Sequence, residues 1–343
     1  MEQITIKTQE AGQRLDKFLR RYLQEATSGF LYKMLRKKNI TLNAGKAEGS
    51  EILCVGDQIT FFFSAETFRK FRGDGKEEGT KETELIRQSK EACQIWKHMP
   101  ILYEDEHVLL ASKPAGVLSQ KAEACDLSLN EWFVGYLLEQ GEVTAQSLRM
   151  FRPSVCNRLD RNTSGIVICG KTLRGSQEMS RLLQDRNLHK YYLFCVEGQM
   201  KEGKTIEGYM WRDEKSNKTC ILDSPCPGSR KIATSYRPLV TGREGTLVEA
   251  LLITGRTHQI RAHLASEGFP LMGDYKYGER KQNDKRKKQY GITHQLLHAH
   301  RLVFPTLTGA MEGLSGREII APVPAIFYAT GIPIKSGREM HRS

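Results

Sequence analysis

The 343-residue chain lacks several features, and each absence excludes a class of protein. It has no run of about 18 apolar residues, which excludes a membrane span. Its first residues, Met1–Lys7, lack the basic start and apolar core of a signal peptide. None of its eight cysteines forms a C-x-x-C pair, so neither a zinc ribbon nor a disulfide framework is expected. We therefore expect a cytoplasmic protein with reduced thiols.

The composition predicts a soluble globular protein with an excess of positive charge. Hydrophobic residues make up 39% of the chain, and the formal net charge is +12 with a pI near 9.3. Such an excess favours a polyanionic partner, although charge alone does not identify one. At 343 residues the chain is long enough for two domains.

One short motif places a carboxylate between two cations. Asp160 lies between Arg158 and Arg161, and a turn-forming Thr163–Gly165 leads into the apolar strand Ile166–Cys169. Guanidinium groups within hydrogen-bond reach favour the charged form of a carboxylate. An ionised carboxylate suits a nucleophile or an electrostatic stabiliser better than a general acid. The alternative for this motif alone is a surface turn ahead of a strand.

The motif resembles the HRLDRxTSG signature of the RluA family of RNA pseudouridine synthases, with Asn157 where many members carry His. Three further segments resemble the family's motifs in the same order, at residues 103–116, 190–198 and 252–264. Residues 271–278 follow at the distance that the family shows. The resemblance covers roughly residues 98–330.

The resemblance implies roles for five side chains. It makes Asp160 the catalytic residue, Arg261 the arginine that pairs with it, and Tyr192 the tyrosine that stacks on the target uracil. The alternative for Tyr192 is an ordinary aromatic packed inward from a strand. Arg158 resembles the residue that enters the RNA stack where the target base has left it, and Arg161 is the alternative for that role.

The same resemblance implies the reaction and the partner. The reaction is isomerisation of uridine to pseudouridine in RNA, with neither cofactor nor metal. Large-subunit (23S) ribosomal RNA, or a ribosome-assembly intermediate, is the expected partner of a chain that we expect to be monomeric. The alternatives are the same reaction on tRNA, a noncatalytic RNA-binding assembly factor on the same fold, and a glycosidase-like hydrolase.

The histidines do not predict a metal site. His258 and His263 lie five residues apart, and His294, His298 and His300 cluster near a strand. His298 and His300 alternate with apolar and basic residues in strand fashion, and no cysteine or carboxylate joins them at ligand spacing.

Residues 1–64 predict a small α+β RNA-binding module. Apolar residues at helical spacing predict one helix around 15–23 and a second over 28–38 with Ser28 as its N-cap, and short strands are expected at 40–43, 51–55 and 58–63. Residues 13–19 and 33–43 resemble segments of the S-four-like RNA-binding domain of a ribosomal small-subunit protein and of tyrosyl-tRNA synthetases. The cations of the module are expected to form one RNA-binding face. These cations are Arg14, Lys17, Arg20, Arg21, Lys33, Arg36, Lys37, Lys38 and Lys46. Asp16 is interpreted as structural.

The charged composition of residues 65–97 predicts a flexible linker, within which part of 82–96 is a candidate helix. A catalytic domain is expected over 98–331. That domain is expected to be α+β, with a mixed, mainly antiparallel sheet and flanking helices. Expected strands are 108–112, 165–170, 191–196, 231–238, 246–254 and 297–304, and expected helices are 128–139, 175–186 and 257–267. A basic loop over 280–288 either touches phosphates or is a solvated insertion. A basic tail is expected over 332–343.

Overall fold

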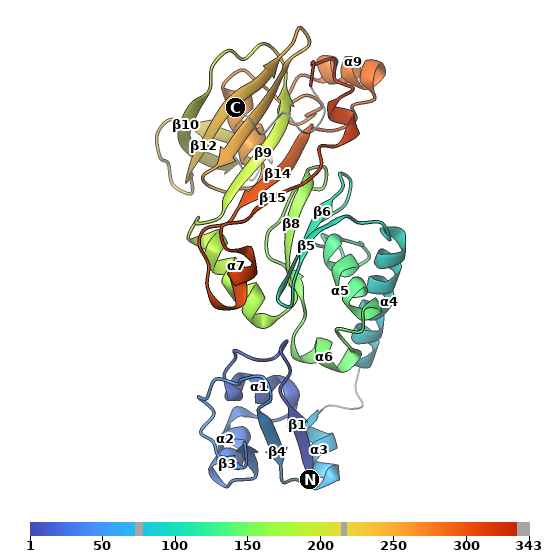
Figure 1. Ribbon diagram of the computed structural model, residues 1–343, viewed down its shortest axis with the longest axis vertical. Helices are drawn as coiled ribbons and strands as arrows, with labels where there is room; N and C mark the ends of the chain where they lie inside the picture. Colours follow the sequence, from blue (N-terminus) through green and yellow to red (C-terminus); the bar gives the residue numbers. More distant parts are fainter. Residues whose placement is uncertain (73–77, 214–217, 335–343) are drawn as a thin grey trace.

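A computed structural model describes residues 1–72, 78–213 and 218–334 of the chain. In Figure 1 a small N-terminal module (blue) lies below a larger region built around one long sheet. The expectation of an α+β fold with a mixed, mainly antiparallel sheet is confirmed. Residues 335–343 of the predicted tail lie outside the described residues. No helix within the described ranges has the length and apolar character that crossing a membrane requires.

The N-terminal module packs two helices against a four-stranded sheet with the strand order β1-β4-β2-β3. Its elements are β1 (Glu2–Thr5), α1 (Leu15–Tyr22), α2 (Ser28–Arg36), β2 (Ile40–Leu42), β3 (Gly45–Lys46) and β4 (Gln58–Phe61). The N-cap of α2 is Thr27, whose side chain accepts from Phe30 N, and not Ser28 as predicted. The strand predicted over 51–55 is wrong, because only Ile52 forms an isolated bridge there, to Arg14.

The prediction of a flexible linker over 65–97 is wrong for most of its length. Residues 73–77 lie outside the described residues, and on either side stand α3 (Ala65–Arg72) and α4 (Glu78–Ile95). Phe68 of α3 is buried in the core of the N-terminal module, which therefore extends past residue 64. The charged composition did not exclude a helix, because Lys, Glu, Arg and Gln are good helix formers. The helix α4 forms because it buries one narrow face against α5.

The large sheet has eleven strands, and its main path runs β11-β10-β12-β13-β9-β14-β8-β6-β5. Its strands are β5 (Ile101–Glu104), β6 (Val108–Lys113), β7 (Ser154–Val155), β8 (Ser164–Gly170), β9 (His189–Val196), β10 (Lys204–Asp213), β11 (Lys218–Leu222), β12 (Arg230–Thr241), β13 (Thr246–Leu252), β14 (Leu297–Val303) and β15 (Glu318–Ile320). All six strands expected from the sequence are present. The pairing of β14 with β8 is parallel, which makes the sheet mixed.

The helices of this region divide between the two faces of the sheet. They are α5 (Leu129–Glu139), α6 (Ala145–Met150), α7 (Leu173–Gln184), α8 (Gln259–Ser266) and α9 (Arg280–Tyr290), with short 3-10 turns at Gly309–Leu314 and Ala325–Phe327. Along β6, Leu109 and Ala111 pack in the core that α5 and α8 share. Val108 and Leu110 pack on the opposite face, in the core that α7 covers. The candidate site belongs to the face of α5 and α8.

The basic loop predicted over 280–288 is instead the helix α9. It contains neither glycine nor proline, and Gly291 ends it in the left-handed conformation at φ 72°. The sequence concealed this helix because it has no apolar stripe: its buried residues are Asn283 and Arg286. Polar anchors therefore replace the usual hydrophobic face.

Candidate active site

Asp160 lies in a loop of residues 158–164, here called the Asp160 loop, which leads into β8. A turn closes it, in which Thr163 N donates to Asp160 O at 3.0 Å. Leu159 is buried, and its backbone N–H and C=O both bond to Ser119 Oγ, at 3.0 and 2.9 Å. At Gly165 the φ of +110° and the close approach of Ala299 O, 2.2 Å from where a Cβ would stand, require glycine. The loop thus holds Asp160 in one place.

Lys113 fixes the same loop from beneath. Its side chain is fully buried, and Nζ donates to Val117 O at 2.8 Å, Arg161 O at 3.0 Å and Pro114 O at 3.1 Å. Burial lowers the pKa of Lys113 to about 7, and the charge of Asp160 opposes that shift. Lys113 was not singled out as a functional residue from the sequence, although it lies in the segment that resembles the family's entry strand.

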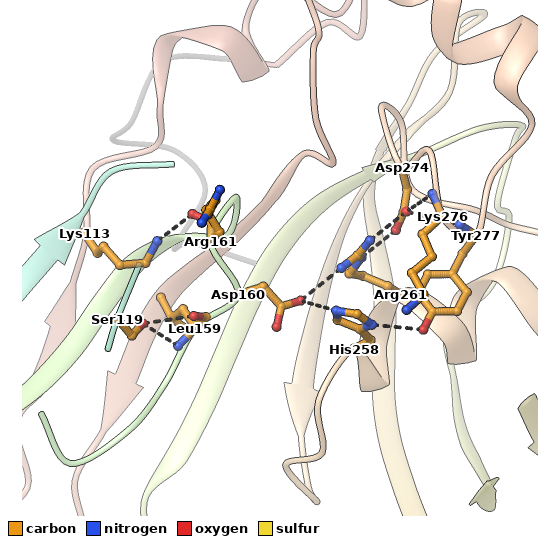
Figure 2. A network of polar contacts seen from close by, with 10 residues as sticks. All are labelled: Lys113, Ser119, Leu159, Asp160, Arg161, His258, Arg261, Asp274, Lys276 and Tyr277. Carbon is orange, nitrogen blue, oxygen red and sulfur yellow. Dashed lines mark hydrogen bonds and ion pairs between the residues drawn. The ribbon is translucent and has the colours of Figure 1, made fainter. Parts of the chain in front are cut away.

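Arg261 contacts the catalytic candidate directly. Its Nη1 donates to Asp160 Oδ2 at 3.1 Å, which brings together residues 101 positions apart in the sequence (Figure 2). On its other side Asp274 receives two hydrogen bonds from Arg261, Nε to Oδ2 at 2.7 Å and Nη2 to Oδ1 at 2.9 Å. Such a bidentate pair fixes the direction of the guanidinium as well as its charge. Asp274 therefore points Arg261 at Asp160.

The electrostatics of this pair depend on its burial. Asp274 is fully buried, and its Oδ1 also accepts the backbone N–H groups of Lys276 and Tyr277. Burial alone would lower the pKa of Arg261, but its hydrogen bonds and ion pair with Asp274 outweigh burial, so the pKa is raised. Arg261 thus stays charged beside Asp160 at neutral pH.

His258 forms a second contact to the same carboxylate oxygen. Its Nε2 lies 3.6 Å from Asp160 Oδ2, and its Nδ1 shares a hydrogen bond with the Tyr277 hydroxyl at 3.0 Å. Burial lowers the pKa of His258, although the charge of Asp160 opposes the shift. His258 adopts a left-handed φ of 61° just before α8, a conformation that costs energy in a non-glycine residue. Asp160 Oδ1 has no donor among the described residues, and the side chain is 24% exposed.

The predicted neighbours of Asp160 lie as follows. Tyr192 on β9 is 8% exposed, and burial together with the charge of Asp160 raises its pKa, so the phenol stays protonated. Tyr191 lies on the opposite face, where the Arg301 guanidinium stacks 3.7 Å from the centre of its ring. Arg158 and Arg161 are both exposed, one on each side of the buried Leu159 and the partly buried Asp160.

The nine cations predicted for RNA binding in the N-terminal module are all exposed, as an RNA-binding face requires. Two of them also have partners inside the protein. Arg14 pairs with Asp16 at 3.1 Å, and Arg21 Nη1 donates to Met150 O at 3.3 Å. Asp16 in addition accepts from the Tyr32 hydroxyl at 2.9 Å, which agrees with its interpretation as structural. The other predicted cations form no ion pair within the described ranges.

The histidines bond to groups of the protein. His298 Nδ1 shares a hydrogen bond with Ser164 Oγ at 2.8 Å, and His300 Nδ1 bonds to Ala321 O at 2.9 Å. His263 Nδ1 contacts Thr234 Oγ1 at 3.2 Å. Within the described part of the chain no three His, Cys, Asp or Glu side chains gather as metal ligands would. All eight cysteines are free, and Cys93, Cys169 and Cys195 are buried.

Replacing Lys113 by Met will flatten the dependence of stability on pH. The pKa of Lys113, about 7 in the folded protein, lies below its ordinary 10.5. Between these values the unfolded chain binds a proton that the folded chain releases, so stability rises with pH across this window and is lost as the pH falls toward 7. One such group contributes a slope of at most about 1.4 kcal/mol per pH unit. Urea unfolding at pH 7 to 9.5 measures it, and equal slopes in both proteins would contradict the assignment.

The comparisons with known proteins concern the part of the chain that carries this site. Residues 107–266 match the sequence profile of a family described as RNA pseudouridylate synthase. Asp160, Tyr192 and Arg261 all lie within the matched segment. The segment that carries the site is therefore similar to RNA pseudouridine synthases, enzymes that isomerise uridine to pseudouridine.

Particular relatives extend the likeness to most of the chain. The ribosomal large subunit pseudouridine synthase C of Vibrio cholerae is 29% identical over 309 residues, which is 88% of each chain. An uncharacterized RNA pseudouridine synthase of Mycoplasma genitalium is 28% identical over 306 residues, again 88% of each chain. The structure of human RNA pseudouridylate synthase domain containing 4 is similar in fold, with a TM-score of 0.56 at 19% identity, covering 71% of this chain and 95% of that chain.

Proposed function

We propose that this protein isomerises specific uridines of large-subunit (23S) ribosomal RNA, with Asp160 as its catalytic residue and without a cofactor. The observation that carries the proposal is the contact of Asp160 with Arg261, which Asp274 orients from behind. The Vibrio relatives are named for the ribosomal large subunit, and this supports rRNA over tRNA.

The geometry supports a division of labour among the side chains. Asp160 offers Oδ1 to the target nucleotide, as nucleophile or as stabiliser of charge at the sugar, while Arg261 holds Oδ2. Tyr192 keeps a neutral phenol, whose ring stacks on the uracil. Stacking on a base contributes about 1–3 kcal/mol. Extruding the uridine from its stack costs about a few kcal/mol, and the exposed Arg158 fills the space that it leaves.

A hydrolase that cleaves the glycosidic bond is the less favoured alternative. Such enzymes normally place two carboxylates on either side of the bond. One carboxylate near Asp160 is Asp274, which is fully buried and accepts hydrogen bonds from Arg261 and from two backbone N–H groups. It is therefore unsuited to activate a water or to protonate a leaving group.

Tritium release tests the proposal. Large-subunit rRNA transcribed with uracil labelled at C5 should release tritium to solvent while the RNA chain and its base content stay intact, since only isomerisation replaces that hydrogen. Release of free uracil would instead indicate a hydrolase. Binding without release would indicate a noncatalytic RNA-binding protein, and release from tRNA alone would overturn the choice of rRNA.

The exposed cations of the N-terminal module should dominate the salt dependence of RNA binding. The triple variant Lys17→Gln, Lys33→Gln, Lys37→Gln removes three exposed charges that form no ion pair with the described residues, and it leaves the buried core intact. Each lost phosphate contact lowers the slope of log affinity against log salt by about 0.7 on single-stranded RNA. A filter-binding titration between 50 and 200 mM salt measures it. An unchanged slope would mean that this face does not contact RNA.

A further inference from the structure

The outward face of α9 carries a row of lysines that the fold does not use. The residues that α9 buries are Asn283 and Arg286. Helical spacing places Lys281, Lys285 and Lys288 on the side opposite them, at i, i+4 and i+7. All three side chains are exposed, and within the part of the chain that the structure describes none of them pairs with a carboxylate. We call these three residues the lysine row.

The lysine row includes one like-charged pair at i, i+4, Lys281 and Lys285. Such a pair destabilises a helix by about 0.2–0.5 kcal/mol, and Asp284, four residues before Lys288, offsets part of this repulsion. An anionic ligand would remove this repulsion. The row extends over about 10 Å at about 1.5 Å per residue, which suits successive phosphates of a polynucleotide better than one compact anion.

Asn283 bonds α9 to the loop that carries Asp274. Its Oδ1 accepts Gly273 N at 2.8 Å, and its Nδ2 donates to Asp274 O at 2.9 Å. Asp274 in turn bonds Arg261, and Arg261 bonds Asp160. A short chain of hydrogen bonds, all between buried or partly buried groups, thus leads from the helix to the catalytic carboxylate.

Arg286 anchors α9 a second time, three residues after Asn283. Its guanidinium donates to Glu197 at 3.1 and 2.8 Å, and to Glu244 at 2.6 Å. Glu197 directly follows β9, the strand of Tyr192. The helix is therefore held against both segments that shape the site, and its outer face keeps a constant offset from Asp160.

We propose that the lysine row of α9 is a docking surface for the phosphate backbone of the substrate RNA, at a fixed distance from the catalytic carboxylate. This inference rests on the proposed function, since it assigns a second RNA contact to the same enzyme. RNA that is held on α9 and on the N-terminal module would be bound on two sides of the target uridine.

The experiment compares the full-length protein with the variant Lys281→Gln, Lys285→Gln, Lys288→Gln. Binding of a large-subunit rRNA transcript is measured by filter retention between 50 and 200 mM salt. Loss of three phosphate contacts should lower the salt slope by about 2 and weaken binding at 50 mM salt by roughly tenfold or more. The variant should fold as the wild type does, because the buried anchors Asn283 and Arg286 are untouched.

Two control variants test whether a lower slope comes from lost charge on α9 in particular. The variant with Arg at the same three positions keeps the charge and should bind as the wild type does. The variant Lys90→Gln, Lys97→Gln removes exposed charge near α4 and should change the slope by less per charge. A wild-type slope in the α9 variant, with tritium release intact, would overturn this inference and leave the proposed function standing. Failure of the wild-type protein to release tritium would instead refute the proposed function, whatever the slope.

Discussion

Replacing Asp160 by Asn will abolish tritium release, with kcat at least about a thousandfold below wild type. Asparagine keeps the volume of the side chain but removes the negative charge that faces Arg261 at 3.1 Å and His258 at 3.6 Å. The measurement is single-turnover release from C5-labelled rRNA with enzyme in excess.

The same variant should keep its affinity for RNA within about twofold, because the cations that meet phosphate lie elsewhere. Its folding should also be retained, since the Asp160 side chain is 24% exposed. Turnover near wild type would refute the assignment of Asp160. Loss of RNA binding together with turnover would show instead that the substitution disturbs the loop.

Replacing Asp274 by Ala will lower both stability and turnover. Arg261 would lose its Nε and Nη2 partners in a buried position, and breaking a buried ion pair costs about 3–5 kcal/mol. Without its bidentate partner Arg261 no longer points at Asp160, so kcat should fall roughly a hundredfold. Urea unfolding and single-turnover release, at a temperature where the variant is fully folded, measure the two effects.

The conservative variant Asp274→Asn separates charge from shape. Its amide keeps the volume and one acceptor oxygen, so it should recover part of the stability and less of the turnover. KM for RNA should stay close to wild type in both variants, because Asp274 is fully buried. If turnover returned to wild type once the alanine variant was folded, Asp274 would be structural only.

The sequence predicted six strands of the large sheet from local patterns, and the pairing of Asp160 with Arg261 from the family resemblance of its ordered motifs. It did not predict the role of Asp274, because a carboxylate that orients an arginine on another element leaves no local signature. It failed at α9 and at the start of α4, although the candidate helix within 82–96 is confirmed. In α9, buried polar side chains hold the helix in place, and in α4 a narrow face of the helix is buried. Both helices are otherwise as charged as a solvent-exposed loop, so their composition did not reveal α9 or the start of α4.

The N-terminal module is fastened to the catalytic region. Met150 at the end of α6 is buried in the core of the module, and Arg21 donates to its carbonyl oxygen at 3.3 Å. Under the proposed function, this packing, and not a flexible tether, sets the separation between the cations of α1 and α2 and the carboxylate of Asp160. We expect the protein to select its target uridine partly by distance. In the folded RNA, that uridine must lie at a set distance from the phosphate backbone that the N-terminal module binds.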